Sequence, residues 1–443
     1  MSRIPAQYKN IIRLALPIIL ANASAPLLGL ADTAAIGQTG SAEDLGGIAL
    51  ATLVFSFVYW GFGFLRMGTT GFVAQAWGAK NREDVLSILY RSLLLALFIG
   101  LVLIILQIFI IKLATFWMSA EDSVIDLVKD YFYIRIWGAP ATLMTYAILG
   151  TFIGLGKTRE LMWVQLLLNG LNISLNILFV VVFHMGVKGI AWGTVLSEYT
   201  ALFFAWFILA KILPIKNIKQ QIKELWSKII EKSKVISMFQ VNRDIMIRTF
   251  ALLAGFAWFA DRGAQFNAST LAANHVLLQF VSLSAFFLDG FAYVVEMQSG
   301  QSIGEKNKKN FIQYIKDSSV IAAITAFILA ATFYFTSTWI IPLFSQDAIV
   351  QHIALEHIHF ASIYILFSFA AFLLDGIFIG ATQSRDMRNA SVFSFIIFFA
   401  SSYFMTIYYG NTGLWISFIL YVIVRAIGLA YYFPSLVNKH FIK

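Results

Sequence analysis

The chain alternates between long apolar runs and short segments that carry most of its charge. A helix that spans the hydrocarbon core of a bilayer needs about 20 mostly apolar residues. Twelve runs reach this length: residues 11–36, 47–76, 86–113, 130–153, 161–183, 188–211, 237–261, 270–298, 311–336, 355–380, 389–410 and 413–434. The pattern therefore predicts an all-α integral membrane protein with twelve transmembrane helices.

The short segments between these runs differ in their content of Lys and Arg. If the N-terminus is cytoplasmic, the inner segments hold 25 of the 32 Lys and Arg residues and the outer segments hold five, among them Arg135. Cytoplasmic loops of membrane proteins carry such an excess, so we expect both termini in the cytoplasm. The net charge of +9 fits contact with anionic inner-leaflet lipid and does not require nucleic acid as a partner.

Composition narrows the function classes. Apolar residues make up 59% of the chain and charged residues 12%, against about 25% charged residues in a soluble domain. The absence of cysteine excludes disulfides, thiol catalysis and cysteine-bound metals. We find no nucleophile–base set, metal motif or phosphate-binding loop, so we expect neither an enzyme nor a cofactor.

The two halves of the sequence resemble each other at one constant offset, which places residue 75 on residue 301 and is called the repeat offset below. QAWGAKN (75–81) aligns with QSIGEKN (301–307), and GTFIGLGKTR (150–159) aligns with GIFIGATQSR (376–385). Each half then holds six helices, and an even number returns the chain to its starting side. We therefore expect two six-helix bundles related by pseudo-two-fold symmetry about the membrane normal, as in parallel-repeat transporters.

This duplication predicts three parts: an N-terminal lobe (1–211), a cytoplasmic basic linker (212–236) and a C-terminal lobe (237–443). Apolar residues of the linker recur at helical spacing beside several lysines, which indicates an amphipathic helix at the inner membrane surface. A solvated linker is an equal alternative. Two lobes that rock about a cleft suit a transporter, whereas a channel would more often be built from several identical subunits.

Four stretches resemble one transporter family, multidrug and toxic compound extrusion (MATE), in its DinF branch. They are LLGLADTAAIG (27–37), FLRMGTTGFVAQAWGAKN (64–81), FFLDGFAYVVEMQSGQSIGEKN (286–307) and FLLDGIFIGATQSRDMRNA (372–390). The resemblance implies an antiporter in the bacterial inner membrane that exports organic, often cationic and aromatic compounds in exchange for H⁺ or Na⁺. We expect it to act as a monomer.

The resemblance also implies a cation-coupling site in the N-terminal lobe, formed by Asp32, Asn172, Asn176 and Thr194. Archaeal members carry a carboxylate where this chain has Asn176. The cluster therefore holds one acid, which favours H⁺ over a Na⁺ site with two carboxylates, although Na⁺ remains an alternative. No other metal is expected.

The sequence around Asp32 also indicates a functional residue, independently of the family resemblance. It lies toward the outer end of an apolar run with no Lys or Arg nearby in sequence, and acids within membrane spans usually face a cavity or a partner. A buried acid without a cationic partner favours its neutral form, so Asp32 could exchange a proton at working pH. The alternative is a solvated acid at a helix end.

Pro17 and Pro26 lie on the same helix as Asp32. Each removes a backbone hydrogen bond and weakens the helix locally, so protonation could change which bend the helix prefers. A static kink is the alternative, because proline is tolerated in membrane helices without a gating role.

Asn169, Asn172 and Asn176 share one helix face, because they are spaced at i, i+3 and i+7. Their amides could hydrogen-bond Asp32 in either protonation state, or offer oxygens to Na⁺. Polar packing between helices is the alternative. Thr194 could instead bond the backbone of its own helix.

The C-terminal lobe holds further charges within its apolar runs. Asp289 and Asp375 could form a second cation or substrate site, with Asn169 as a further candidate for the polar cleft. Alternatively, the acids pair with Arg248, and Arg248, Glu296 and Arg66 belong to a structural charge network. We favour the structural interpretation slightly, because a nearby arginine keeps acids ionised.

A different function within the same superfamily is a flippase for lipid-linked precursors. A pyrophosphate cleft would need several cationic residues, and the N-terminal lobe offers only Arg66 within its helices. This scarcity favours the antiporter.

Overall fold

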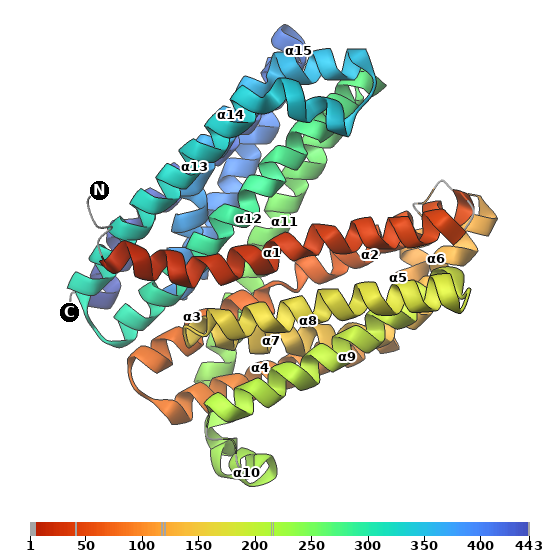
Figure 1. Cartoon of the computed structure of the whole chain (residues 1–443). Coiled ribbons are helices and arrows are strands. Elements are labelled where there is room, and N and C mark those ends of the chain that lie inside the picture. The colour runs from red at the N-terminus through yellow and green to blue at the C-terminus, as the bar shows by residue number, and fades with distance from the viewer. Residues whose placement is uncertain are drawn as a thin grey trace. The chain divides into compact units, whose positions relative to one another are not determined.

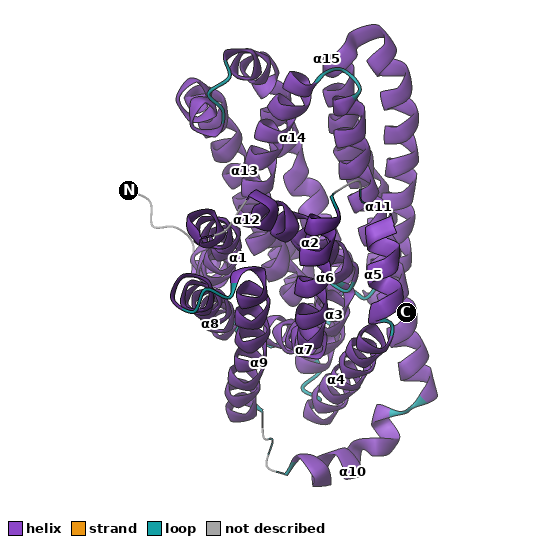
Figure 2. Cartoon of the chain, turned by 90° about the vertical axis from the view of Figure 1, so that its right-hand side faces the viewer, coloured by secondary structure: helices purple, strands orange, loops and turns teal. Residues whose placement is uncertain are grey.

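The computed structural model describes residues 6–39, 42–116, 118, 121–213, 215 and 217–441, and their side chains except those of residues 6, 25, 27, 28, 30–39 and 42. The described residues form helices and loops, with no strand among them (Figure 1). Figure 2 shows that the loops between consecutive helices are short.

The first half of the chain contains α1 (Ala6–Thr39), α2 (Ala42–Gly61), α3 (Phe64–Gly78), α4 (Arg82–Ile105), α5 (Gln107–Phe116), α6 (Asp122–Arg135), η1 (Ile136–Gly138), α7 (Ala139–Gly154), α8 (Thr158–Ile177), η2 (Leu178–Val182) and α9 (Gly186–Ile212). After α10 (Ile218–Ile229), the second half contains α11 (Lys232–Ala264), α12 (Ala268–Gly304), α13 (Lys308–Phe344), α14 (Ala348–Gly380) and α15 (Ser384–Phe441).

The helices account for the twelve predicted spans. Nine helical segments of the described chain are long and apolar enough to cross a membrane. One of them, α15, contains two helices joined at a kink, where Gly410 has φ 54° and ψ −134°. Together with α1 and α11, of 34 and 33 residues, this gives twelve.

The helices extend beyond the apolar runs that predicted them. For example, α14 begins at Ala348 rather than at residue 355, because Asp347 caps its first turn by accepting hydrogen bonds from the backbone N–H groups of Ile349 and Val350. Polar caps satisfy the free donors at a helix start, and a search for apolar residues does not detect them.

The sequence duplication is present in the fold at the same repeat offset. Helix α1 begins at Ala6 and α11 at Lys232, while α7 ends at Gly154 and α14 at Gly380. The left-handed residues also correspond, since Lys80 has φ 57° and its equivalent Lys306 has φ 54°. The chain therefore contains two copies of one six-helix pattern, with α10 inserted between them.

One close approach between helices recurs in both copies. A Cβ atom added at Gly150 would lie 2.4 Å from the carbonyl oxygen of Arg66, and one added at Gly376 would lie 2.5 Å from that of Ala292. Only glycine allows the helix backbones to pack at this distance. The two glycines are repeat equivalents, so this contact explains why both aligned motifs begin with glycine.

The helices form two compact units. The C-terminal unit contains Met1–Ile19, Ala74–Lys80 and Phe239–Lys443, and the N-terminal unit contains Leu20–Val73 and Asn81–Met238. Helix α1 therefore contributes its first half to the C-terminal unit and its second half to the N-terminal unit. Aromatic side chains from α11 and α15, including Phe259, Trp415 and Phe418, lie in the core of the C-terminal unit.

Candidate functional site

Three asparagines on α8 form a buried polar stripe in the N-terminal unit. Asn169, Asn172 and Asn176 are only 7%, 2% and 1% exposed. The Asn169 amide donates to Ser24 Oγ at 2.5 Å, and the Asn176 amide donates to Asn172 Oδ1 at 2.6 Å. Buried amides need such partners, so the stripe lies against other helices rather than lipid.

Ser24 connects this stripe to helix α1. Its hydroxyl donates to the carbonyl of Ala21 at 2.6 Å and accepts the bond from Asn169. The contact lies between Pro17 and Pro26 in sequence; Pro17 is buried and Pro26 is exposed. The predicted polar face of α8 therefore meets the predicted coupling helix.

The other end of the stripe lies against α9. A Cβ atom added at Gly193 would come within 2.1 Å of Asn176 Oδ1, so the absence of a side chain at Gly193 makes room for this amide. The neighbouring Thr194 donates its hydroxyl to the carbonyl of Ile190 at 2.8 Å. Thr194 thus hydrogen-bonds the backbone of its own helix, which is the alternative given in the sequence analysis.

The helix changes its winding directly after the stripe. Residues Leu178–Val182 form the π-helical segment η2, which continues α8 from Ile177. Such segments are rare and occur frequently at functional sites. Asn176 therefore lies at the junction between α-helical and π-helical backbone.

Asp32, the predicted coupling acid, belongs to α1, but its side chain lies outside the described residues. Its contacts and burial are therefore not part of the observed site. The helix that carries it continues without interruption from Ala6 to Thr39, through both prolines.

The C-terminal unit contains a buried charge cluster. Asp375 of α14 forms an ion pair with Arg248 of α11, and Arg425 Nη2 of α15 lies 4.0 Å from Asp375 Oδ2. All three side chains are buried. The structure thus joins a predicted cleft residue, Asp375, directly to a predicted structural residue, Arg248.

The other predicted charges differ in burial. Glu296 is buried on α12, where Asp289 is half-buried. Arg66 is half-buried on α3, and its carbonyl oxygen accepts a bond from Thr70 Oγ1 at 2.9 Å. Within the described residues, no group of three His, Cys, Asp or Glu side chains could hold a metal ion.

The N-terminal unit contains a second buried ion pair, which the sequence analysis does not predict. Arg135 Nη1 and Nη2 donate to the two carboxylate oxygens of Glu198 at 2.7 and 2.5 Å. The sequence analysis assigns Arg135 to an outer segment, but in the structure it lies within the helical span Asp122–Gly154. There it is buried against the rings of Phe55 and Tyr59. Glu198 could have been singled out as an acid within an apolar run.

Sequence comparisons agree with this architecture. The sequence model of the MatE family matches residues 17–178 and 263–404. The chain is 32% identical to DNA damage-inducible protein F (DinF) of Escherichia coli over 435 residues, which cover 97% of this chain and 93% of that protein. The chain belongs to the MATE family.

Other MATE relatives are more distant. Protein DETOXIFICATION 44, chloroplastic, of Arabidopsis thaliana is 27% identical, over 95% of this chain and 81% of that protein. A probable multidrug resistance protein NorM of Halalkalibacterium halodurans is 24% identical, over 96% and 93% of the two chains. These relatives are transporters rather than enzymes, and this MATE protein is a multi-pass membrane protein.

Solved structures share the fold. An outward-facing multidrug resistance MATE family transporter of the MOP superfamily superposes with a TM-score of 0.85 at 18% identity, over 98% of this chain and 96% of that one. Structures of MATE in the straight and bent conformations also give 0.85, at 19% identity and the same coverage. The predicted all-α fold with twelve spans in two bundles is confirmed.

Proposed function

We propose that this MATE protein is a secondary active antiporter that exports organic cationic, aromatic compounds in exchange for H⁺ by alternating access. Protonation of Asp32 is the coupling step. The proposal is supported by its relatives, several of which are named multidrug resistance proteins, and by the buried amide stripe of α8. The bacterial relative DinF favours the bacterial inner membrane as its location.

The contact between Ser24 and Asn169 relates the depth of Asp32 in the membrane to that of Asn176. Helices α1 and α8 are the first and fifth spans, so they cross the membrane in the same direction. Asp32 is eight residues beyond Ser24, and Asn176 is seven beyond Asn169. At a rise of about 1.5 Å per residue both steps cover about 11–12 Å, so Asp32 and Asn176 are expected at similar depth.

The repeat gives independent support for this pairing. The repeat offset aligns Asp32 with Trp258 and Asn176 with Ser402. In the C-terminal unit the Trp258 indole N–H donates to Ser402 Oγ at 2.8 Å. The residues at the equivalent positions of the C-terminal unit are thus in direct contact, which supports Asn176 as the proposed partner of Asp32.

An amide stripe suits a proton-exchanging acid. An amide offers both a donor and an acceptor, so Asn172 and Asn176 could bond the carboxylate as well as the carboxylic acid. Protonation of Asp32 would then change which bend the helix prefers at Pro17 and Pro26. Na⁺ is the alternative ion, because amide oxygens are hard ligands, but a second carboxylate is missing at Asn176.

We also propose the wider organisation expected from the sequence: lobes 1–211 and 237–443 that alternate access, both termini in the cytoplasm, and a monomer surrounded by lipid. The linker 212–236 contains α10, whose Lys228 pairs with Glu83 of α4. The hydrogen bond to this carboxylate raises the pKa of Lys228, so this lysine stays charged at neutral pH.

Asp32→Asn tests the coupling step in cells. Expression of the wild-type protein is expected to lower ethidium accumulation, and Asp32→Asn is expected to abolish this effect at equal protein levels. Asp126→Asn is the matched control, since it removes a carboxylate whose side chain is 73% exposed. Export by Asp32→Asn at the wild-type rate would refute the assignment.

A further inference from the structure

The linker helix α10 carries an exposed stripe of lysine and apolar side chains. Lys219, Lys223, Trp226 and Ile230 are spaced at i, i+4, i+7 and i+11, so they lie on one side of the helix. Trp226 is 47% exposed and Ile230 is 52% exposed, and both lysines are exposed as well. These four residues are called the lysine stripe below.

A different side of α10 is docked on α4. Gln221, Leu225 and Ile229 are spaced at i, i+4 and i+8 and are half-buried or buried. Tyr90 of α4 donates to Gln221 at 2.9 Å, and Arg91 donates to the carbonyl oxygen of Ile229 at 2.8 Å. This contact fixes the rotation of α10 about its own axis, so the lysine stripe stays exposed.

The third side of α10 is polar and bonded within itself. Gln220, Glu224 and Ser227 are spaced at i, i+4 and i+7, and all three are exposed. The amide of Gln220 donates to the Glu224 carboxylate at 2.8 Å. This side has neither a lysine nor an apolar residue, which suits contact with water.

The lysines of the stripe differ from the other lysine of the helix. Lys228 forms an ion pair with Glu83 of α4. In the part of the chain that the structure describes, neither Lys219 nor Lys223 forms an ion pair. Their ammonium groups can therefore bind an anion from outside the protein.

The place of α10 in the chain indicates which anion this is. Helix α9, a membrane span, ends at Ile212, and α10 begins at Ile218 and ends two residues before α11 (Figures 1 and 2). A helix tied so closely to two spans lies at the bilayer surface, where the phosphate groups of the lipids lie. Tryptophan is enriched at this depth, and lysine can lay its stem on apolar surface while its charge reaches a headgroup.

We propose that the lysine stripe binds an anionic phospholipid. Trp226 and Ile230 enter the layer just below the headgroups, and the ammonium groups of Lys219 and Lys223 bind the lipid phosphate. In the orientation proposed above, this lipid belongs to the inner leaflet. The site goes beyond the proposed export function and does not depend on it.

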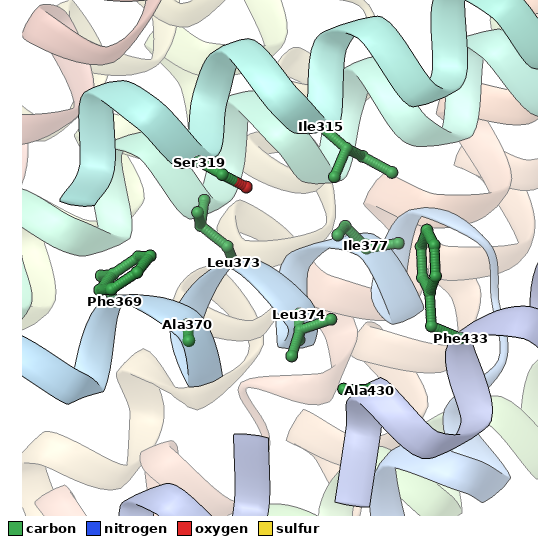
Figure 3. Close-up of a pocket in the computed structure, with 9 residues that line it drawn as sticks. All are labelled: Ile315, Ser319, Phe369, Ala370, Leu373, Leu374, Ile377, Ala430 and Phe433. Atoms are coloured by element: carbon green, nitrogen blue, oxygen red, sulfur yellow. The ribbon is translucent and has the colours of Figure 1, made fainter. Parts of the chain in front are cut away.

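Apolar surface alone does not make such a site. A hollow of about 260 Å³ in the C-terminal unit has an aliphatic or aromatic lining apart from one hydroxyl group (Figure 3): Ile315, Ser319, Phe369, Ala370, Leu373, Leu374, Ile377, Ala430 and Phe433. No charged side chain lines it. It offers contact to acyl chains but no partner to a phosphate, whereas the lysine stripe offers both.

A single fluorescent label tests the proposal, because the natural chain contains no cysteine. Ile230→Cys places a bimane label on the lysine stripe, and Ser227→Cys places it on the polar side as a matched control. The full-length protein is studied in phosphatidylcholine nanodiscs with a rising fraction of phosphatidylglycerol. We expect the label of Ile230→Cys to shift to shorter wavelength as this fraction rises, and that of Ser227→Cys to stay exposed to water.

The lysines are tested in the labelled Ile230→Cys chain. A lysine near an anionic surface strengthens binding about fivefold, so Lys219→Gln and Lys223→Gln together should raise the phosphatidylglycerol fraction needed for half of the shift at least about fivefold. Lys129→Gln and Lys188→Gln together are the control with the same loss of charge, since both lysines pair with aspartates of the protein. We expect no change from this control.

Several results would overturn the site. Equal exposure of both labels to water in phosphatidylglycerol would show a solvated helix. A shift that is complete in phosphatidylcholine, or that survives both lysine substitutions, would show apolar contact without anion binding. A shift caused by inorganic phosphate in phosphatidylcholine would assign the lysines to a soluble anion. Asp32→Asn is expected to leave the shift unchanged, so failure of coupling and failure of this site are distinguishable.

Discussion

At the scale of single residues, the N-terminal unit buries its polar groups in two ways. Asn169, Asn172 and Asn176 remain neutral and are bonded by Ser24 and by one another. Arg135 and Glu198 are charged and form a bidentate pair. Neutral amides can change hydrogen-bond partners at lower cost than a buried ion pair, whose disruption leaves an uncompensated charge. The amides thus suit a site that changes its protonation state.

These two groups also differ in how far the sequence predicts them. The shared face of the asparagines follows from the geometry of one helix, so their spacing was sufficient. Arg135 and Glu198 are 63 residues apart, and their contact depends on how α6 packs against α9. Helix spacing within one element contains no information about such a contact.

Gly193→Ala tests the importance of the amide stripe. The new methyl group would lie 2.1 Å from Asn176 Oδ1, so the amide must move away from α9. Overpacking of this kind costs about 1–3 kcal/mol of unfolding free energy. We expect ethidium export in proteoliposomes to fall about tenfold, which corresponds to about 1.4 kcal/mol.

Gly170→Ala is the matched control for that substitution. Gly170 lies on α8 near the stripe, and a Cβ atom added there meets nothing within 4 Å. We expect normal export from this variant. Equal export by Gly193→Ala and Gly170→Ala would show that the position of Asn176 is not critical.

At the scale of elements, the linker helix α10 is docked rather than free. Arg91 of α4 donates to the carbonyl oxygens of Ile229 and Lys228 at the end of α10, at 2.8 and 2.7 Å. Tyr90 donates to Gln221 at 2.9 Å. The amphipathic pattern predicted this helix but not its contact with α4, because the partner is a single arginine within an otherwise apolar run.

Arg91→Leu is expected to release α10 from α4. Arg91 is only 8% exposed, and it satisfies carbonyl groups that a helix end otherwise leaves free. Limited trypsin digestion should therefore cleave at the lysines of α10 several times faster than in the wild type. Glu83→Gln breaks only the exposed pair with Lys228 and should have little effect. Equal cleavage rates for wild type and Arg91→Leu would contradict the docking.

At the scale of the whole molecule, the two copies of one helix pattern carry different side chains at equivalent positions. The duplication was visible in the sequence as aligned motifs, and the helix ends of the two copies agree with it. The aligned motifs do not show the difference in polarity between the copies, because it appears only when the repeat offset is applied to single positions. Asn169 and Asn176 in one copy correspond to Phe395 and Ser402 in the other. The N-terminal copy thus carries amides where the C-terminal copy carries an aromatic ring and a hydroxyl group.

The most direct test of the central claim is export from proteoliposomes under one gradient at a time. Release of a fluorescent organic cation is recorded under a pH gradient alone and under a Na⁺ gradient alone, for the wild type and for Asp32→Asn. The proposed mechanism predicts that only the pH gradient drives export, and only in the wild type. Export driven by the Na⁺ gradient alone, or undiminished export by Asp32→Asn under the pH gradient, would contradict proton coupling through Asp32.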